Sequence, residues 1–142
     1  LLVADMLNHR RDIACAVISS APGDFRDYLA IHNNPMFESP LILNPIASVA
    51  TIPEDTNRRI FILADPRDEN VKFVLHQPYL DALASNEIPA HFLPLKKALG
   101  PSFHNMVDIA ETAVGLCAEG IPDNEIVRML EAMPTQARRK TN

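Results

Sequence analysis

Two residues of this sequence have types and spacing suited to proton-transfer chemistry: Asp68 and His104, which lie 36 positions apart. Each stands in a polar loop that follows a short apolar run. A carboxylate beside an imidazole can hold one imidazole tautomer and stabilise the imidazolium, while the imidazole takes a proton from a nucleophile. The pair therefore predicts acid–base chemistry, provided that the fold brings the two loops together.

Each of these candidates also has an ordinary structural interpretation. Asp68 could be a turn residue or the N-cap of the following helix, and His104 could be a loop histidine near a helix N-terminus. Asp65 competes with Asp68 for the role of the acid. We expect Glu69 to face solvent, and the ordinary interpretation of Asn70 is a turn asparagine.

The segments around these loops alternate between strand-like and helix-like patterns. Short apolar runs at 13–20, 59–65 and 90–95 predict strands that are buried on both faces, and stretches at 1–9, 73–85, 106–119 and 122–133 predict helices. This alternation predicts the α/β class, with a parallel sheet of about three strands and flanking helices. The carboxyl ends of such strands share one edge, where the loops 65–71 and 96–104 would meet. So thin a sheet leaves the first strand without a neighbour on its other side.

Several residues predict where the helices begin and end. Asp24 should cap a short helix, Asn105 should cap the helix after His104 in a capping box with Asp108, and Gly120 should stop that helix. Pro78 either lies in the first turn of its helix, after a separate turn at 72–76, or kinks it.

We expect a single, partial domain over residues 1–142. Residues 24–58 contain Pro35, Pro40, Pro45 and Pro53 and predict a cap-like or irregular connection. Residues 121–142 should form a terminal helix and a tail, in which the basic cluster 138–140 is solvated.

The overall composition excludes some classes of function. The net charge is −5 with a pI near 5.4, which disfavours a nucleic-acid binder. No stretch reaches the roughly 18 apolar residues that a membrane helix needs, so no membrane partner is expected. The compartment is unknown from the sequence, with the cytoplasm slightly favoured.

The remaining reactive residue types do not suggest a second site. Cys15 and Cys117 lie in apolar surroundings and are expected to be buried free thiols. Metal-ligand spacing is absent, so neither a metal nor a cofactor is predicted. His76 and His91 are expected to be ordinary surface or strand histidines.

Two serines follow the first predicted strand and could be considered as nucleophiles. Ser19 and Ser20 lack the flanking glycines of a nucleophile elbow, in which a strained turn exposes the hydroxyl. We therefore expect both to be turn residues.

Residues 59–105 resemble the C-terminal part of α/β hydrolases, especially the prolyl-oligopeptidase-like serine peptidases and their acyl-hydrolase relatives. That group carries a strand, G-x-x-D-x-x-V, a helix, a second strand and a loop with the catalytic histidine. The corresponding text here is ILADPRDENV, QPYLDAL, HFLPL and GPSFHN. Asp68 matches the acid of the motif and Val71 its valine, whereas Asp65 stands where glycine is usual.

The resemblance extends over roughly residues 1–120, because LLVADML is similar to the helix after the nucleophile elbow and CAVISSAPGDF to the next strand. It implies a serine hydrolase that acts on peptide or ester bonds through an acyl-enzyme. Asp68 and His104 would supply two members of the triad, and Asn70 a substrate contact. The elbow motif G-x-S-x-G is absent and would precede Leu1, so we expect this chain alone to be inactive.

Two other functions remain open. The chain could be a non-enzymatic fragment or subunit whose exposed strand edge pairs with a partner, either the missing N-terminal half or a second copy of itself. Strand–helix alternation also fits a flavodoxin-like binding module, although the sequence lacks a glycine-rich phosphate loop.

Overall fold

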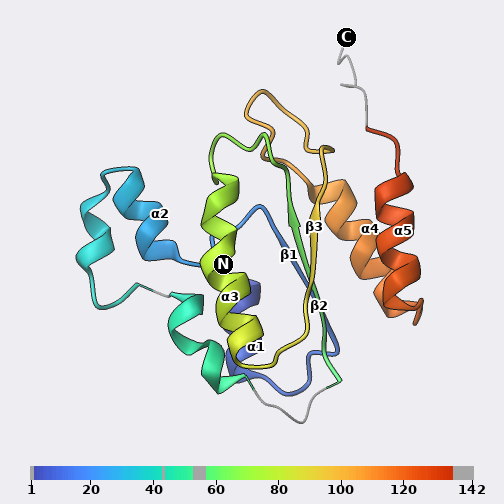
Figure 1. The fold of residues 1–142 in the computed structure, drawn as a ribbon, viewed down its shortest axis with the longest axis horizontal. Helices are drawn as coiled ribbons and strands as arrows, with labels where there is room; N and C mark the ends of the chain where they lie inside the picture. The colour runs from blue at the N-terminus through green and yellow to red at the C-terminus, as the bar shows by residue number, and fades with distance from the viewer. Residues whose placement is uncertain (1, 43, 53–56, 136–142) are drawn as a thin grey trace.

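The computed structural model describes residues 2–42, 44–52 and 57–135, and its centre is a parallel sheet. In this part of the chain the sheet has three strands, β1 (Cys15–Ser19), β2 (Arg59–Ala64) and β3 (His91–Pro94), in the order β1-β2-β3 (Figure 1). The α/β class predicted from the alternation of patterns is confirmed. The basic cluster 138–140 and Pro53 lie outside the described residues.

Helices cover both faces of the sheet (Figure 1). The α-helices are α1 (Leu2–His9), α2 (Phe25–Ile31), α3 (Gln77–Ser85), α4 (Val107–Ala118) and α5 (Asp123–Ala132), and the 3₁₀ helices are η1 (Pro35–Glu38), η2 (Pro45–Thr51) and η3 (Phe73–His76). α1 and α3 lie on one face, and α4 and α5 on the other. No helix among the described residues is long and apolar enough to cross a membrane.

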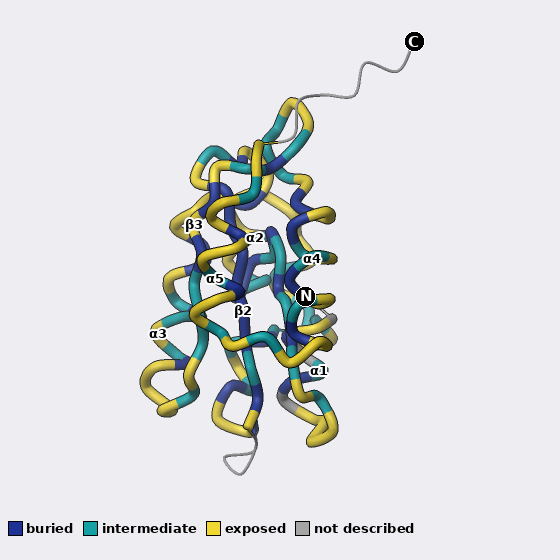
Figure 2. The backbone as a smooth tube through the Cα atoms, turned by 90° about the vertical axis from the view of Figure 1, so that its right-hand side faces the viewer, coloured by how far each residue is buried: buried dark blue, intermediate teal, exposed yellow. Residues whose placement is uncertain are grey.

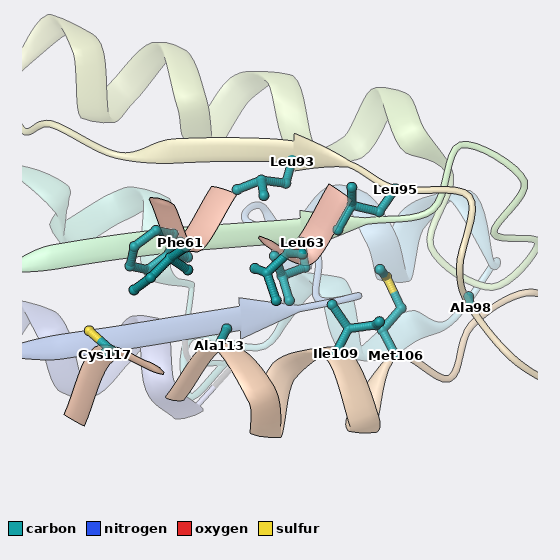
Figure 3. Close-up of a cluster of buried hydrophobic side chains, with 11 residues drawn as sticks. Phe61, Leu63, Leu93, Leu95, Ala98, Met106, Ile109, Ala113 and Cys117 are labelled. Carbon is teal, nitrogen blue, oxygen red and sulfur yellow. The ribbon is translucent and has the colours of Figure 1, made fainter. Parts of the chain in front are cut away.

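β2 is buried along almost its whole length (Figure 2), and it is apolar on both faces because helices cover both faces of the sheet. Ile60 and Ile62 of β2 belong to the core on the α1 and α3 side. Phe61 and Leu63 alternate with them and pack against α4 and α5 (Figure 3). The continuous apolar run that predicted this strand follows directly from this two-sided burial.

The predicted helix boundaries are largely correct. The carboxylate of Asp24 accepts hydrogen bonds from two N–H groups in the first turn of α2, and Gly120 adopts a left-handed φ of 76° just after α4. Pro78 lies in the first turn of α3, after the separate turn of η3. The capping box is wrong: Asn105 accepts from Val107 N–H, but its own N–H donates to Leu99 O, and the cap position belongs to Met106.

Residues 24–58 contain more regular structure than their prolines indicated. The guanidinium of Arg26 donates to the carbonyls of Phe37 and Ser39, at 2.7 and 3.0 Å, and so ties α2 to the chain around η1. η2 packs against α1 and α3. This connection therefore forms part of the layer on one face of the sheet.

The expectation of free thiols is wrong, because Cys15 of β1 and Cys117 of α4 form a disulfide. Their Cα atoms lie 6.5 Å apart although the residues are 102 positions apart in sequence. The crossing of α4 over β1 brings them together, which no local pattern predicts. Disulfides persist mainly in oxidising compartments, so the slight preference for the cytoplasm gains no support from the structure.

Reduction of the disulfide should destabilise the protein. The bridge closes a long loop, and removing such a native bridge typically costs about 2–5 kcal/mol. We expect dithiothreitol to lower the urea midpoint of the wild type, monitored by circular dichroism. The double variant Cys15→Ala, Cys117→Ala should have a low midpoint that does not respond to the reductant. Alkylation of both cysteines in denatured but unreduced protein would contradict the bridge.

Candidate active site

Asp65, the first residue after β2, anchors the acid loop. Its carboxylate is fully buried and accepts hydrogen bonds from the backbone and guanidinium of Arg67, at 2.7–2.9 Å, and from Ala98 N–H at 3.0 Å. Burial alone would raise the pKa of Asp65, but these donors outweigh it and leave the pKa below its ordinary value. Asp65 therefore joins the loops after β2 and β3 and is not the partner of His104.

The histidine loop is held at its base and at its tip. Leu99 and Asn105 pair as an antiparallel bridge that closes the intervening five residues. The guanidinium of Arg67 lies 4.2 Å from the centre of the Phe103 ring, directly beside His104. Phe103 has a φ of 52°, a left-handed conformation that costs energy for a bulky residue and requires such surrounding contacts.

Asp68 and His104 meet as the sequence predicted. His104 Nδ1 lies 2.8 Å from Asp68 Oδ2, and the side chain of Asp68 is only 1% exposed whereas that of His104 is 40% exposed. The other oxygen of Asp68 accepts from Asn70 N–H at 2.8 Å and from Val71 N–H at 2.9 Å. The carboxylate is therefore fixed on one side by the backbone and turned toward the imidazole on the other.

Two further contacts connect the acid loop with the histidine loop. Glu69 N–H donates to Ser102 O at 2.9 Å, while the Glu69 side chain is exposed as expected. The amide of Asn70 donates to Ser102 Oγ at 3.3 Å. Asn70 is exposed at the protein surface and does not line the groove described below, so its role as a substrate contact stays a prediction.

The connection 24–58 also reaches the acid loop. His32, next to the end of α2, lies with Nε2 at 3.2 Å from the carbonyl oxygen of Asn70. Its ring is tilted against Tyr28, with centroids 4.6 Å apart. The cap-like segment therefore contacts the acid loop at Asn70.

A groove lies on the other side of His104, between the edge of β1 and α4. It has a volume of about 790 Å³ and is lined by Val17, Ser19, Ser20, His104, Asn105, Met106, Val107, Ala110, Glu111, Val114 and Gly115. We call it the β1–α4 groove. Because a carboxylate at Nδ1 fixes the proton on that nitrogen, Nε2 is left as the proton acceptor. Among the described residues Nε2 has no hydrogen-bond partner.

Ser20 has features that sequence reasoning missed. It has a φ of 46°, lies just after β1 and is only 8% exposed, and its Oγ has no hydrogen-bond partner among the described residues. A non-glycine residue in this conformation at the carboxyl end of a parallel strand is typical of ligand sites. Only its position after a predicted strand could have indicated Ser20 from the sequence, because Ser20 and its neighbours do not form an elbow motif.

His76 was predicted to be an ordinary surface or strand histidine, and this is wrong. It lies in η3, is 3% exposed and has its ring near those of Phe73 and Phe92. Its Nε2 is buried without a partner among the described residues. Burial lowers the pKa of His76, and the negative charge of Asp68 opposes this only in part.

His91, in contrast, is a half-exposed strand histidine as predicted. Its Nε2 lies 2.9 Å from Asp123, which also pairs with Arg59 of β2. Burial would raise the pKa of Asp123, but hydrogen bonds from Arg59 and His91 lower it overall. These residues lie at the opposite end of the sheet from the groove, where they attach α5.

In the part of the chain that the structure describes, no three His, Cys, Asp or Glu side chains are grouped so that they could hold a metal ion. What the site offers chemically is a proton acceptor beside a buried carboxylate. No protein-family model, curated protein or solved structure matches the chain significantly.

The buried His76 should make folding stability depend on pH. Because its folded pKa lies below the unfolded value of 6.5, the unfolded chain binds the extra proton first. We expect the free energy of unfolding to fall as the pH decreases from about 6.5 toward the folded pKa. Urea titrations between pH 7.5 and 4.5 should show a smaller fall for His76→Phe than for the wild type. An unchanged slope in His76→Phe would refute the assignment.

The Asp68 contact should also fix the tautomer of His104. In ¹H–¹⁵N long-range spectra above neutral pH, we expect the wild-type His104 ring to carry its proton on Nδ1. Asp68→Asn should populate the Nε2–H form as well, because a neutral amide can pair with either tautomer. Asp81→Asn, on the exposed face of α3, should leave the His104 spectrum unchanged. An Nε2–H tautomer in the wild type would contradict the pairing.

Proposed function

We propose that this chain is the C-terminal half of an α/β-hydrolase-type serine hydrolase, which cleaves ester or peptide bonds through an acyl-enzyme. Asp68 and His104 would be the acid and the base of its triad. The observation that carries the proposal is the 2.8 Å contact between His104 Nδ1 and the buried oxygen of Asp68. The nucleophile would come from outside these 142 residues.

The environment of Asp68 favours this role over that of a turn residue. Its Oδ1 does accept the two backbone bonds expected of a turn aspartate, from Asn70 and Val71. Its second oxygen, which a turn does not need, is buried and directed at a partly exposed imidazole. A carboxylate so restrained can hold the imidazole in one orientation and stabilise its cation.

In the proposed reaction, His104 Nε2 accepts the proton of a nucleophilic hydroxyl as its oxygen attacks the carbonyl carbon. Asp68 keeps the resulting imidazolium in place without itself taking the proton. The imidazolium then gives that proton to the leaving alcohol or amine, and an acyl-enzyme remains. Water, deprotonated by the same imidazole, releases the acid product and regenerates the site.

Labelling with a serine-hydrolase probe tests this function in the complete gene product. A fluorophosphonate should add to one serine outside residues 1–142, as located by peptide mass spectrometry. His104→Ala should abolish labelling, and Asp68→Asn should slow ester hydrolysis by roughly 10⁴-fold if the dyad works as in known triads. His91→Gln serves as the control, because its own contact with Asp123 lies far from the groove.

The possible outcomes separate the parts of the proposal. An adduct on Ser19 or Ser20 would keep a serine hydrolase but refute the external nucleophile. Labelling that persists in His104→Ala would refute the role of the dyad. Folded, complete protein that neither labels nor hydrolyses a panel of esters and peptides would refute the hydrolase itself.

A second candidate function is non-enzymatic pairing of the strand edge with a partner chain. It is favoured by the position of β1, which pairs with β2 on one side only among the described residues. An apolar strand at an open edge is a template for another strand. The two candidates are compatible, since the same partner could also bring the nucleophile.

A further inference from the structure

The hydrogen bonds of β1 reveal which of its backbone groups are available to a partner. Arg59 N–H donates to Ala14 O, and Ser20 N–H donates to Leu63 O, both at 3.0 Å. In a parallel pair, the N–H and C=O of one residue point to the same neighbour, and successive residues alternate between the two sides. Ala14, Ala16, Ile18 and Ser20 therefore face β2, and Cys15, Val17 and Ser19 direct their N–H and C=O groups to the free edge.

The same alternation places the side chains of the edge-facing residues on the α4 side. Cys15 and Val17 pack against the core beneath α4, and Val17 and Ser19 line the β1–α4 groove. Free backbone groups and the groove thus lie together along one side of β1. An occupant of the groove would necessarily meet these donors and acceptors.

The opposite wall of the groove is a face of α4 that is apolar apart from the side chain of Glu111. Val107, Ala110, Glu111 and Val114 follow one another at spacings of three or four residues, so they share one face of the helix. Val107 and Val114 are each 53% exposed, although they lie beside the buried core. This wall would gain from contact with apolar side chains of an occupant.

We propose that the β1–α4 groove binds an extended polypeptide segment that adds to the sheet as a fourth strand, parallel to β1, with apolar side chains against α4. The segment would bond through its backbone to Cys15, Val17 and Ser19. Its carboxyl end would lie next to Ser20 and His104, since these residues are at the carboxyl ends of the strands. This inference rests on, and specifies, the strand-pairing function proposed above.

Other occupants fit these features less well. A hydrocarbon chain could cover Val107 and Val114 but would leave the edge N–H and C=O groups dehydrated and unpaired, which is costly. The parallel direction continues the two parallel pairs already present, and purely parallel sheets are favoured over random mixtures.

Amide hydrogen exchange of the 142-residue chain tests the predicted alternation. The N–H groups of Ala16, Ile18 and Ser20 should exchange slowly because they donate to β2. Those of Val17 and Ser19 should exchange fast, since they face open water. Slow exchange at all five positions in a monomer would contradict the inference that one edge of β1 is free. If the edge amides become protected as the protein concentration rises, and sedimentation detects dimers, the occupant of the groove is a second copy of the chain and not a peptide.

A defined peptide then tests the occupant. We would titrate ¹⁵N-labelled protein with a capped seven-residue peptide of alternating valine and threonine. Val17 and Ser19 N–H should become protected, and the methyl signals of Val107 and Val114 should shift. A nitroxide at the carboxyl end of the peptide should broaden His104, and one at its amino end should broaden Cys15. The reverse pattern would overturn the parallel direction.

Two matched controls separate strand pairing from apolar adhesion. The same peptide N-methylated at alternate residues keeps its side chains but loses the donors of one edge, and it should bind about tenfold more weakly or not at all. Val114→Glu should weaken binding at least about tenfold, because a buried carboxylate would lack a partner. Val74→Glu, an exposed apolar position on η3, should have no effect.

Equal binding of the methylated peptide, or displacement of the peptide by octanoate without loss of edge protection, would overturn strand addition. A failure of this kind is independent of the hydrolase proposal, since the His104 tautomer and the probe labelling are read without the peptide.

Discussion

The buried carboxylate of Asp65 is the interaction on which the order of the site depends. A charge in this position is tolerated only when its lone pairs are satisfied, and Asp65 accepts bonds from Arg67 and from Ala98 N–H. Those donors belong to the loops that carry Asp68 and His104. The hydrogen bonds that stabilise the buried carboxylate of Asp65 therefore also fix the loop that carries Asp68. Arg67 extends the restraint by stacking on Phe103, next to the histidine.

This arrangement explains why two acids that look interchangeable in sequence have different roles. Asp65 points into the protein, where it joins two loops, while Asp68 turns back through its own backbone bonds toward His104. The carboxylate of Asp65 gives the loop a fixed shape through these hydrogen bonds.

Local sequence patterns predicted the strands and the helix boundaries, which depend mainly on residues close together in the sequence. The apolar runs predicted β1, β2 and β3, and the turn residues predicted Asp24, Pro78 and Gly120 in their places. The order of the two loops was enough to bring Asp68 to His104, because parallel strands end at one edge. Features that arise from tertiary contact escaped prediction: the disulfide of Cys15 with Cys117, the burial of His76, and the enclosed hydroxyl of Ser20. Each of these features depends on which elements pack together. The residues next to each position in the sequence do not determine that packing.

Water in the open groove affects the interaction between Asp68 and His104. His104 is 40% exposed and is one of the residues that line the groove. In water the charge of Asp68 acts only weakly on an imidazolium, whereas in a dehydrated site the same charge acts several times more strongly. A strand that fills the β1–α4 groove would exclude water from Val107 and from His104 together. If the proposed strand binds, the completion of the sheet and the removal of water from the Asp68–His104 pair are one physical event.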